Sequence, residues 1–149
     1  MNRPLCLYRP TDLQAIFDSM PPGELAGSTI VVSGDGRYHN PAAIQAILRI
    51  AAASGVARAW VGRGGLLSTP AVSAVLRRRE GGGVASLGIV LTASHNPGGP
   101  DGDFGIKYNT RGGSPATEQQ TEAAYRRSLE ISEYRMVIGG PDVDLERMG

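Results

Sequence analysis

The sequence predicts an α/β protein, a three-layer α/β/α domain whose sheet is mixed and mostly parallel. Three observations support this fold class. Short apolar runs rich in β-branched residues alternate with longer segments whose apolar residues recur at helical spacing. Stretches rich in Gly (21 in the chain) and Pro (10) separate these segments. At 149 residues the chain has the usual size of one domain and can bury a single core.

The order of the segments predicts the topology. Helices are expected over 11–20, 41–54, 70–80 and 115–132, and strands over 28–33, 57–61, 87–92 and 103–109. Strand, helix, strand, helix, strand is typical of parallel strands with helices on the sheet faces. The connection between the last two strands is short enough for an antiparallel pair. In the last helix Ala123, Ala124 and Leu129 are expected inside, and 139–149, with its Gly-Gly-Pro, predicts a linker or frayed end.

Hydroxyl and amide side chains mark the expected helix starts. Thr11 and Gln14 have the spacing of a capping box, in which the side chain of each residue accepts a hydrogen bond from the backbone N–H of the other. Asn40, Thr69 and Ser114 each precede a proline, the pattern of an N-cap followed by the first helical residue. The caps therefore define where four helices begin.

Composition excludes several classes of function. The net charge is +1, and the basic run at 77–79 is followed at once by Glu80, so clustered cations for nucleic-acid phosphates are absent. No apolar run approaches the ~20 residues of a membrane span. Residues 1–10 lack the apolar core of a signal peptide, and the lone Cys6 cannot form an intramolecular disulfide. We expect a cytoplasmic protein without a nucleic-acid or membrane partner.

The polar loop between the last two predicted strands concentrates chemically capable side chains. Ligands of α/β sheets bind outside the carboxyl ends of the strands, where this loop, 34–37 and 62–65 are all expected. Ser94 is a candidate phosphate carrier or nucleophile, and His95 a proton relay or a hydrogen bond to phosphate. Lys107 lies on the return strand and could face the same opening. The loop is therefore the candidate site.

Four stretches of sequence resemble a known family. They are Thr-Ala-Ser-His-Asn-Pro-Gly-Gly at 92–99, Asp-Phe-Gly-Ile-Lys-Tyr-Asn at 103–109, Gly-Asp-Gly-Arg-Tyr at 34–38 and Leu-Ser-Thr-Pro-Ala at 67–71. Together they resemble the phosphoserine domain of the α-D-phosphohexomutases, in the form found in eukaryotic-type phosphoglucomutases. The similarity runs in order and spacing from about Thr11 to about Tyr134.

The resemblance implies a function for the candidate residues. Ser94 would carry a phosphoryl group and exchange it with a hexose phosphate through a hexose 1,6-bisphosphate, interconverting glucose 1-phosphate and glucose 6-phosphate. Lys107 would stabilise the transferring group, and His95 would be an acid/base or orienting residue. Asn96 and Arg37 would bind substrate. Mg²⁺ would bind the Ser94 phosphate, with its remaining ligands absent from this chain, and glucose 1,6-bisphosphate would act as activator.

The chain also departs from the family pattern. The family has four domains, and only the first is expected here, over 11–138. The early Gly-Thr-Ser-Gly-Leu-Arg segment is missing, and residues 1–10 replace the family's first strand, so one sheet edge is expected to be unpaired. The other catalytic domains would have to come from a longer chain or another protein. We expect the isolated chain to have little or no mutase activity.

Alternatives remain open from the sequence alone. The chain could be a non-catalytic remnant or truncated gene product that acts as a binding or structural module. Arg37 could pin a strand end by a salt bridge, and His95 could only shape the loop. The choice between glucose and mannose phosphates is also open, because the family's sugar-selecting loop is absent.

Overall fold

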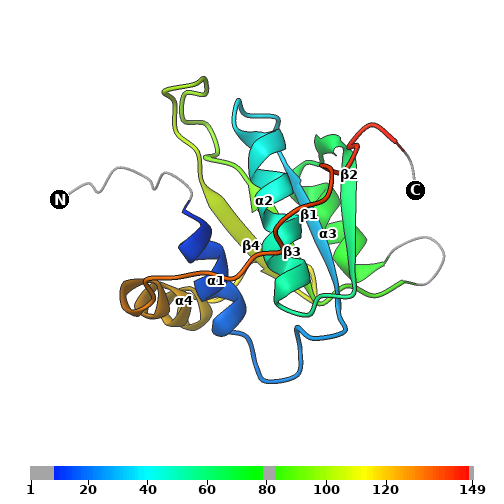
Figure 1. Ribbon diagram of the computed structural model, residues 1–149. Helices are drawn as coiled ribbons and strands as arrows, with labels where there is room; N and C mark the ends of the chain where they lie inside the picture. The colour runs from blue at the N-terminus through cyan, green and yellow to red at the C-terminus, as the bar shows by residue number, and fades with distance from the viewer. Residues whose placement is uncertain (1–8, 79–82, 148–149) are drawn as a thin grey trace.

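The computed structural model describes residues 9–78 and 83–147. The elements, in order, are α1 (Pro10–Asp18), β1 (Thr29–Gly34), α2 (Asn40–Ala53), β2 (Arg58–Leu66), α3 (Thr69–Arg77), β3 (Leu87–Leu91), β4 (Ile106–Thr110) and α4 (Glu118–Glu130) (Figure 1). The described strands form one sheet in the order β2-β1-β3-β4. β1 pairs in parallel with β2 and β3, and β4 is antiparallel to β3. The predicted mixed, mostly parallel sheet is confirmed.

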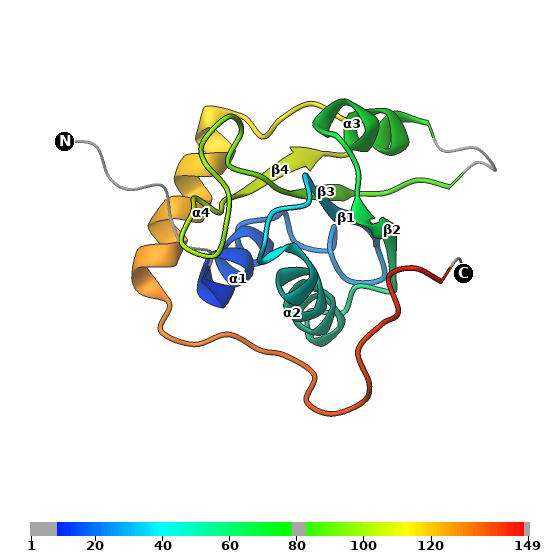
Figure 2. The ribbon, with the colours of Figure 1, turned by 90° about the horizontal axis from the view of Figure 1, so that it is seen from above.

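Helices cover both faces of this sheet, which gives the three predicted layers (Figure 2). Ile30 and Val32 of β1 and Ile89 of β3 belong to the larger core, which α1 and α2 share. Val31 and Val90 point the other way, into a smaller core beneath α3. Successive side chains of a strand alternate between faces, so strands buried on both sides are apolar throughout. This is why the β-branched runs identified β1 and β3.

α1 begins at Pro10, and its predicted capping box is wrong. The N-cap residue is Arg9 instead of Thr11, and the Asp12 carboxylate, three residues further on, accepts the Arg9 N–H at 3.2 Å. Gln14 is buried, and its side-chain oxygen accepts a backbone N–H from the segment after α4. Proline is favoured as the first residue of a helix, so the helix begins at Pro10 and Thr11 lies within its first turn instead of at the cap.

The caps of the next two helices are each shifted by one residue. Asn40 lies within the first turn of α2, where it is buried and its Nδ2 donates to the Gly65 carbonyl at 3.1 Å. Ser68, rather than Thr69, caps α3 through its Oγ. α3 is shorter than predicted and ends at Arg77, and residues 79 and 80 of its expected range lie outside the described residues.

β2 extends beyond its predicted end at residue 61. The segment 62–65, expected as a polar loop, continues the strand to Leu66, and the register against β1 shifts between Val32 and Gly34. Gly64 has φ +62°, which glycine tolerates at such an irregularity. Sequence patterning misread the glycines as a turn because a bulged strand and a turn use the same residues.

α4 is capped by Thr117, whose hydroxyl and the Gln120 side chain form a capping box. This start is three residues later than predicted. Of the residues expected inside, Ala124 is buried, whereas Ala123 is exposed and Leu129 is 64% exposed. α4 packs against α1, so only a narrow stripe of it is covered. None of the described helices has the length and apolar character that crossing a membrane requires.

The segment after α4 lies across α2 and reaches β2 (Figure 2). Gln45 of α2 donates to the Val143 carbonyl at 2.8 Å and accepts the Val143 N–H at 3.0 Å. Arg49 donates to the carbonyls of Gly139 and Gly140. The described part of 139–149 is thus held by hydrogen bonds. The domain bounds at 11–138 stay a prediction, and residues 1–8 of the N-terminal segment lie outside the described residues.

Candidate active site

The candidate site is the loop from Thr92 to Gly105, which joins the carboxyl end of β3 to the start of β4 (Figure 1). It lies where α/β sheets bind ligands. Ser94 has φ +58° and is the only non-glycine residue with a positive φ among those described. A left-handed serine costs about 1–3 kcal/mol, so neighbouring groups must hold it in place.

Lys107 lies next to the Ser94 hydroxyl. Its Nζ donates to Ser94 Oγ at 2.6 Å, although the two residues are thirteen positions apart. The antiparallel register brings them together, because Lys107 pairs with Val90, shortly before the loop. Both residues are exposed, so an incoming group can reach the hydroxyl. A fixed ammonium at this oxygen favours negative charge that develops on it or on a phosphoryl group.

A second contact fixes the Ser94 backbone. The Ser94 N–H donates to Thr92 Oγ1 at 3.0 Å, and the Thr92 hydroxyl in turn donates to Asp35 Oδ2 at 2.6 Å. Asp35 follows β1, the strand beside β3, so the loop is tied to the neighbouring strand end. The conformation of Ser94 therefore depends on a carboxylate from another loop.

Arg37 binds the loop through its whole guanidinium group. Its side chain is 9% exposed and forms an ion pair with Asp35. The group has five N–H donors, and the structure gives partners to all five. The acceptors are Asp35 Oδ2 at 3.1 Å and the carbonyl oxygens of Pro97 at 3.3 Å, Asp103 at 2.8 Å, Ser94 at 2.9 Å and Asn96 at 3.0 Å.

The other predicted site residues have fewer contacts. His95 is exposed, and its side chain makes no hydrogen bond within 9–78 and 83–147. The side chain of Asn96 is likewise unbonded there and is partly exposed. The structure therefore brings Lys107 to the Ser94 hydroxyl, whereas the Arg37 side chain is directed at the loop backbone.

Sequence reasoning missed three contributors. Asp35 and Thr92 were noted only as parts of motifs, yet they hold Ser94. His39 has its Nε2 3.0 Å from the Pro100 carbonyl oxygen and packs edge-on against Phe104. The matching Gly-Asp-Gly-Arg-Tyr string was the one signal that pointed to this neighbouring loop.

No group of three or more His, Cys, Asp or Glu side chains that could hold a metal occurs in the described part of the chain. Mg²⁺ prefers near-octahedral oxygen coordination. The nearby Asp35 carboxylate is bonded to Arg37 and Thr92. The described side chains therefore do not form a Mg²⁺ site by themselves.

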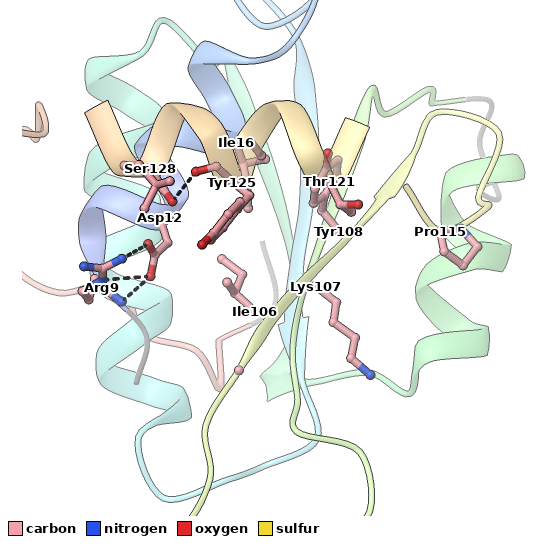
Figure 3. A pocket seen from close by; sticks show the side chains of 13 residues that line it. Arg9, Asp12, Ile16, Ile106, Lys107, Tyr108, Pro115, Thr121, Tyr125 and Ser128 are labelled. Carbon is pink, nitrogen blue, oxygen red and sulfur yellow. Dashed lines mark hydrogen bonds and ion pairs between the residues drawn. The ribbon is translucent and has the colours of Figure 1, made fainter. Parts of the chain in front are cut away.

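An apolar groove of about 820 Å³ lies along β4 between α1 and α4 (Figure 3). Ile106, Tyr125 and Leu129 contribute to its walls. Lys107 also lines the groove, and Figure 3 shows its ammonium pointing away from Tyr125, whereas Ser94 is not among the lining residues. Burial raises the pKa of the Tyr108 hydroxyl on this strand above its ordinary value.

The fold and the loop define a three-layer α/β/α domain that carries an exposed serine, hydrogen-bonded to a lysine, after its third strand. The model of the phosphoglucomutase/phosphomannomutase family, alpha/beta/alpha domain I, matches residues 13–135. The chain therefore belongs to this family.

Individual relatives agree with this assignment. The cytoplasmic phosphoglucomutases of Bromus inermis and Solanum tuberosum are each 51% identical over 144 residues, 95% of this chain and 25% of theirs. The crystal structure of pp63/parafusin, a phosphoglucomutase from Paramecium, superposes with a TM-score of 0.87 at 42% identity, covering 93% of this chain and 25% of that one. The chain spans about a quarter of the length of these relatives. A putative phosphomannomutase from Thermus thermophilus, 24% identical with a TM-score of 0.65 over 97% of this chain and 34% of its own, shares the fold.

Proposed function

We propose that this chain is the phosphoserine domain of a phosphoglucomutase-type enzyme, with 11–138 as the domain. The observation that carries the proposal is the 2.6 Å hydrogen bond from Lys107 Nζ to the exposed Ser94 Oγ, on a loop at the carboxyl edge of the sheet. Such an enzyme interconverts glucose 1-phosphate and glucose 6-phosphate. The naming of the relatives as phosphoglucomutases favours glucose over mannose phosphates, and their naming as cytoplasmic favours that compartment.

The proposed step moves one phosphoryl group. Ser94 Oγ forms a bond to phosphorus as the P–O bond to the sugar oxygen breaks, and the hydroxyl proton leaves as the sugar oxygen gains one. Lys107 neutralises charge on the transferring group, and His95, beside Ser94, relays the proton or orients the hydroxyl. Asn96 contacts the substrate at the same opening. Phosphoryl transfer depends mainly on positioning and charge neutralisation, so these few groups suit it.

Mg²⁺ is the proposed cofactor, and it supplies further charge neutralisation when bound to the Ser94 phosphate. Its other ligands would come from outside this chain, as would the sugar-selecting groups of the remaining domains. Glucose 1,6-bisphosphate is the proposed activator, because it can return a phosphate to an empty Ser94. We therefore expect this chain alone to perform the half-reaction at Ser94 but not the complete mutase cycle.

The half-reaction is testable with the 149-residue chain. Mixing it with glucose 1,6-bisphosphate and Mg²⁺, with glucose 6-phosphate detected by a coupled dehydrogenase, should give a burst of at most one equivalent of product and no steady turnover. Ser94→Ala should remove the burst. Steady conversion of glucose 1-phosphate would show that the chain is a complete mutase. A wild-type chain without a burst would favour the alternative of a non-catalytic module.

A further inference from the structure

Arg37 has no N–H left for a substrate. Its five donors are bound to Asp35 and to four backbone carbonyls, and its side chain is 9% exposed. A phosphate could be bound only by breaking contacts that already satisfy the group. All five guanidinium donors are therefore used in hydrogen bonds within the protein.

The four carbonyls come from both ends of the loop. Ser94 and Asn96 lie at its start, and Asp103 lies where it returns to β4. Carbonyl dipoles that converge on one point repel each other unless a cation lies between them. Arg37 supplies this cation, and its planar guanidinium reaches more acceptors at once than the three donors of a lysine can. Arg37 thus links the start of the loop to its end.

Asp35 connects Arg37 to Ser94 through Thr92. Its Oδ2 accepts from Arg37 Nε and from Thr92 Oγ1, and Thr92 Oγ1 accepts the Ser94 N–H. Two hydrogen bonds therefore hold the Ser94 backbone: Arg37 donates to its carbonyl oxygen, and Thr92 accepts from its N–H. These two contacts flank the left-handed φ of +58° that turns Oγ toward Lys107.

We propose that Arg37, Asp35 and Thr92 are positioning residues that hold Ser94 in its left-handed conformation with Oγ at Lys107, and that Arg37 does not bind substrate. The proposal rests on Ser94 being the phosphate carrier, but its geometric part is measurable without any reaction. Loss of Arg37 should loosen the Ser94 backbone and slow transfer without weakening capture of the phosphate donor.

Arg37→Lys tests the proposal in the 149-residue chain, with Arg63→Lys as the matched control. Arg63 is 74% exposed at the same end of the sheet, and among the described residues its one ion pair is with Glu146 at 3.5 Å. Arg37→Lys should accelerate hydrogen exchange at the Ser94 N–H by about tenfold or more, the effect of losing charge-assisted hydrogen bonds. Arg63→Lys should leave it unchanged. Unchanged exchange at Ser94 in folded Arg37→Lys would overturn the proposal.

The burst kinetics separate positioning from binding. In Arg37→Lys the maximal rate of transfer to Ser94 should fall by about tenfold or more, with the half-saturating concentration of glucose 1,6-bisphosphate unchanged. A raised half-saturating concentration at an unchanged maximal rate would make Arg37 a substrate ligand and overturn the proposal. If the wild type shows no burst, the proposed function fails, and hydrogen exchange still decides the positioning role.

Thr92 provides a second variant pair should Arg37→Lys not fold. Thr92→Val keeps the shape but removes the acceptor of the Ser94 N–H, whereas Thr92→Ser keeps the hydroxyl. We expect rapid exchange at Ser94 in Thr92→Val and near wild-type exchange in Thr92→Ser. Equal rates of hydrogen exchange at the Ser94 N–H in the two variants would contradict the proposed role of Thr92 in holding Ser94.

Discussion

Replacing Lys107 with Met should slow phosphoryl transfer to Ser94 by about 10²–10³-fold, the usual cost of removing a preorganised charge from a site where negative charge develops. The hydrophobic stem remains, so packing on β4 should be unchanged. Lys107 is the only lysine of the chain, against fourteen arginines, so no other lysine can replace it. The measurement is the burst rate with glucose 1,6-bisphosphate, followed by rapid quench.

Lys107→Arg is the control for charge. It restores a cation at the same position of the strand, with a different shape, and should recover part of the lost rate. If Lys107→Met transfers phosphate as fast as the wild type, the 2.6 Å contact with Ser94 Oγ has no catalytic role. In that case the proposed function loses the observation that carries it.

Gly102→Ala should distort the site through the loop backbone. A Cβ at Gly102 would lie 2.7 Å from the Pro97 carbonyl oxygen and would also meet the backbone of Gly98. Backbone atoms cannot move aside as a flexible side-chain end can. Overpacking of this kind costs about 1–3 kcal/mol, which we expect as a lower free energy of unfolding in urea. The burst should slow as well, because Pro97 is one of the Arg37 acceptors.

Gly112→Ala is the matched control for this change. A Cβ at Gly112 would have nothing within 4 Å, and its φ is not in the left-handed region. We expect its stability and burst to equal those of the wild type. Equal stability and equal burst rates of Gly102→Ala and Gly112→Ala would show that the loop backbone shifts at little cost and would contradict a rigid loop.

The sequence indicated the sheet well because strands buried on both faces carry an unambiguous apolar run. Residues 29–34 and 87–91 are of this kind. The glycines at 62–65 were misassigned because a bulged strand and a turn require the same conformational freedom. The exposure of Leu129 could not be foreseen, because it depends on how little of α4 the rest of the chain covers.

The candidate site was predictable only in part. Ser94 and Lys107 were identified from their motif, and the antiparallel register explains why they meet. Sequence reasoning could not show that all five donors of Arg37 are directed to the backbone, because that depends on the path of the loop. Asp35 and Thr92 escaped notice for the same reason, since residues 57 positions apart meet only through the pairing of β1 and β3.

The central claim, that Ser94 carries the phosphate, is tested most directly by peptide mapping. The wild-type chain and Ser94→Ala are incubated with glucose 1,6-bisphosphate and Mg²⁺, digested, and analysed by mass spectrometry. We expect a single phosphate on the wild-type peptide that contains Ser94, localised to that serine by fragmentation, and none on Ser94→Ala. An unmodified wild-type chain, or phosphate on another residue that persists in Ser94→Ala, would contradict the claim.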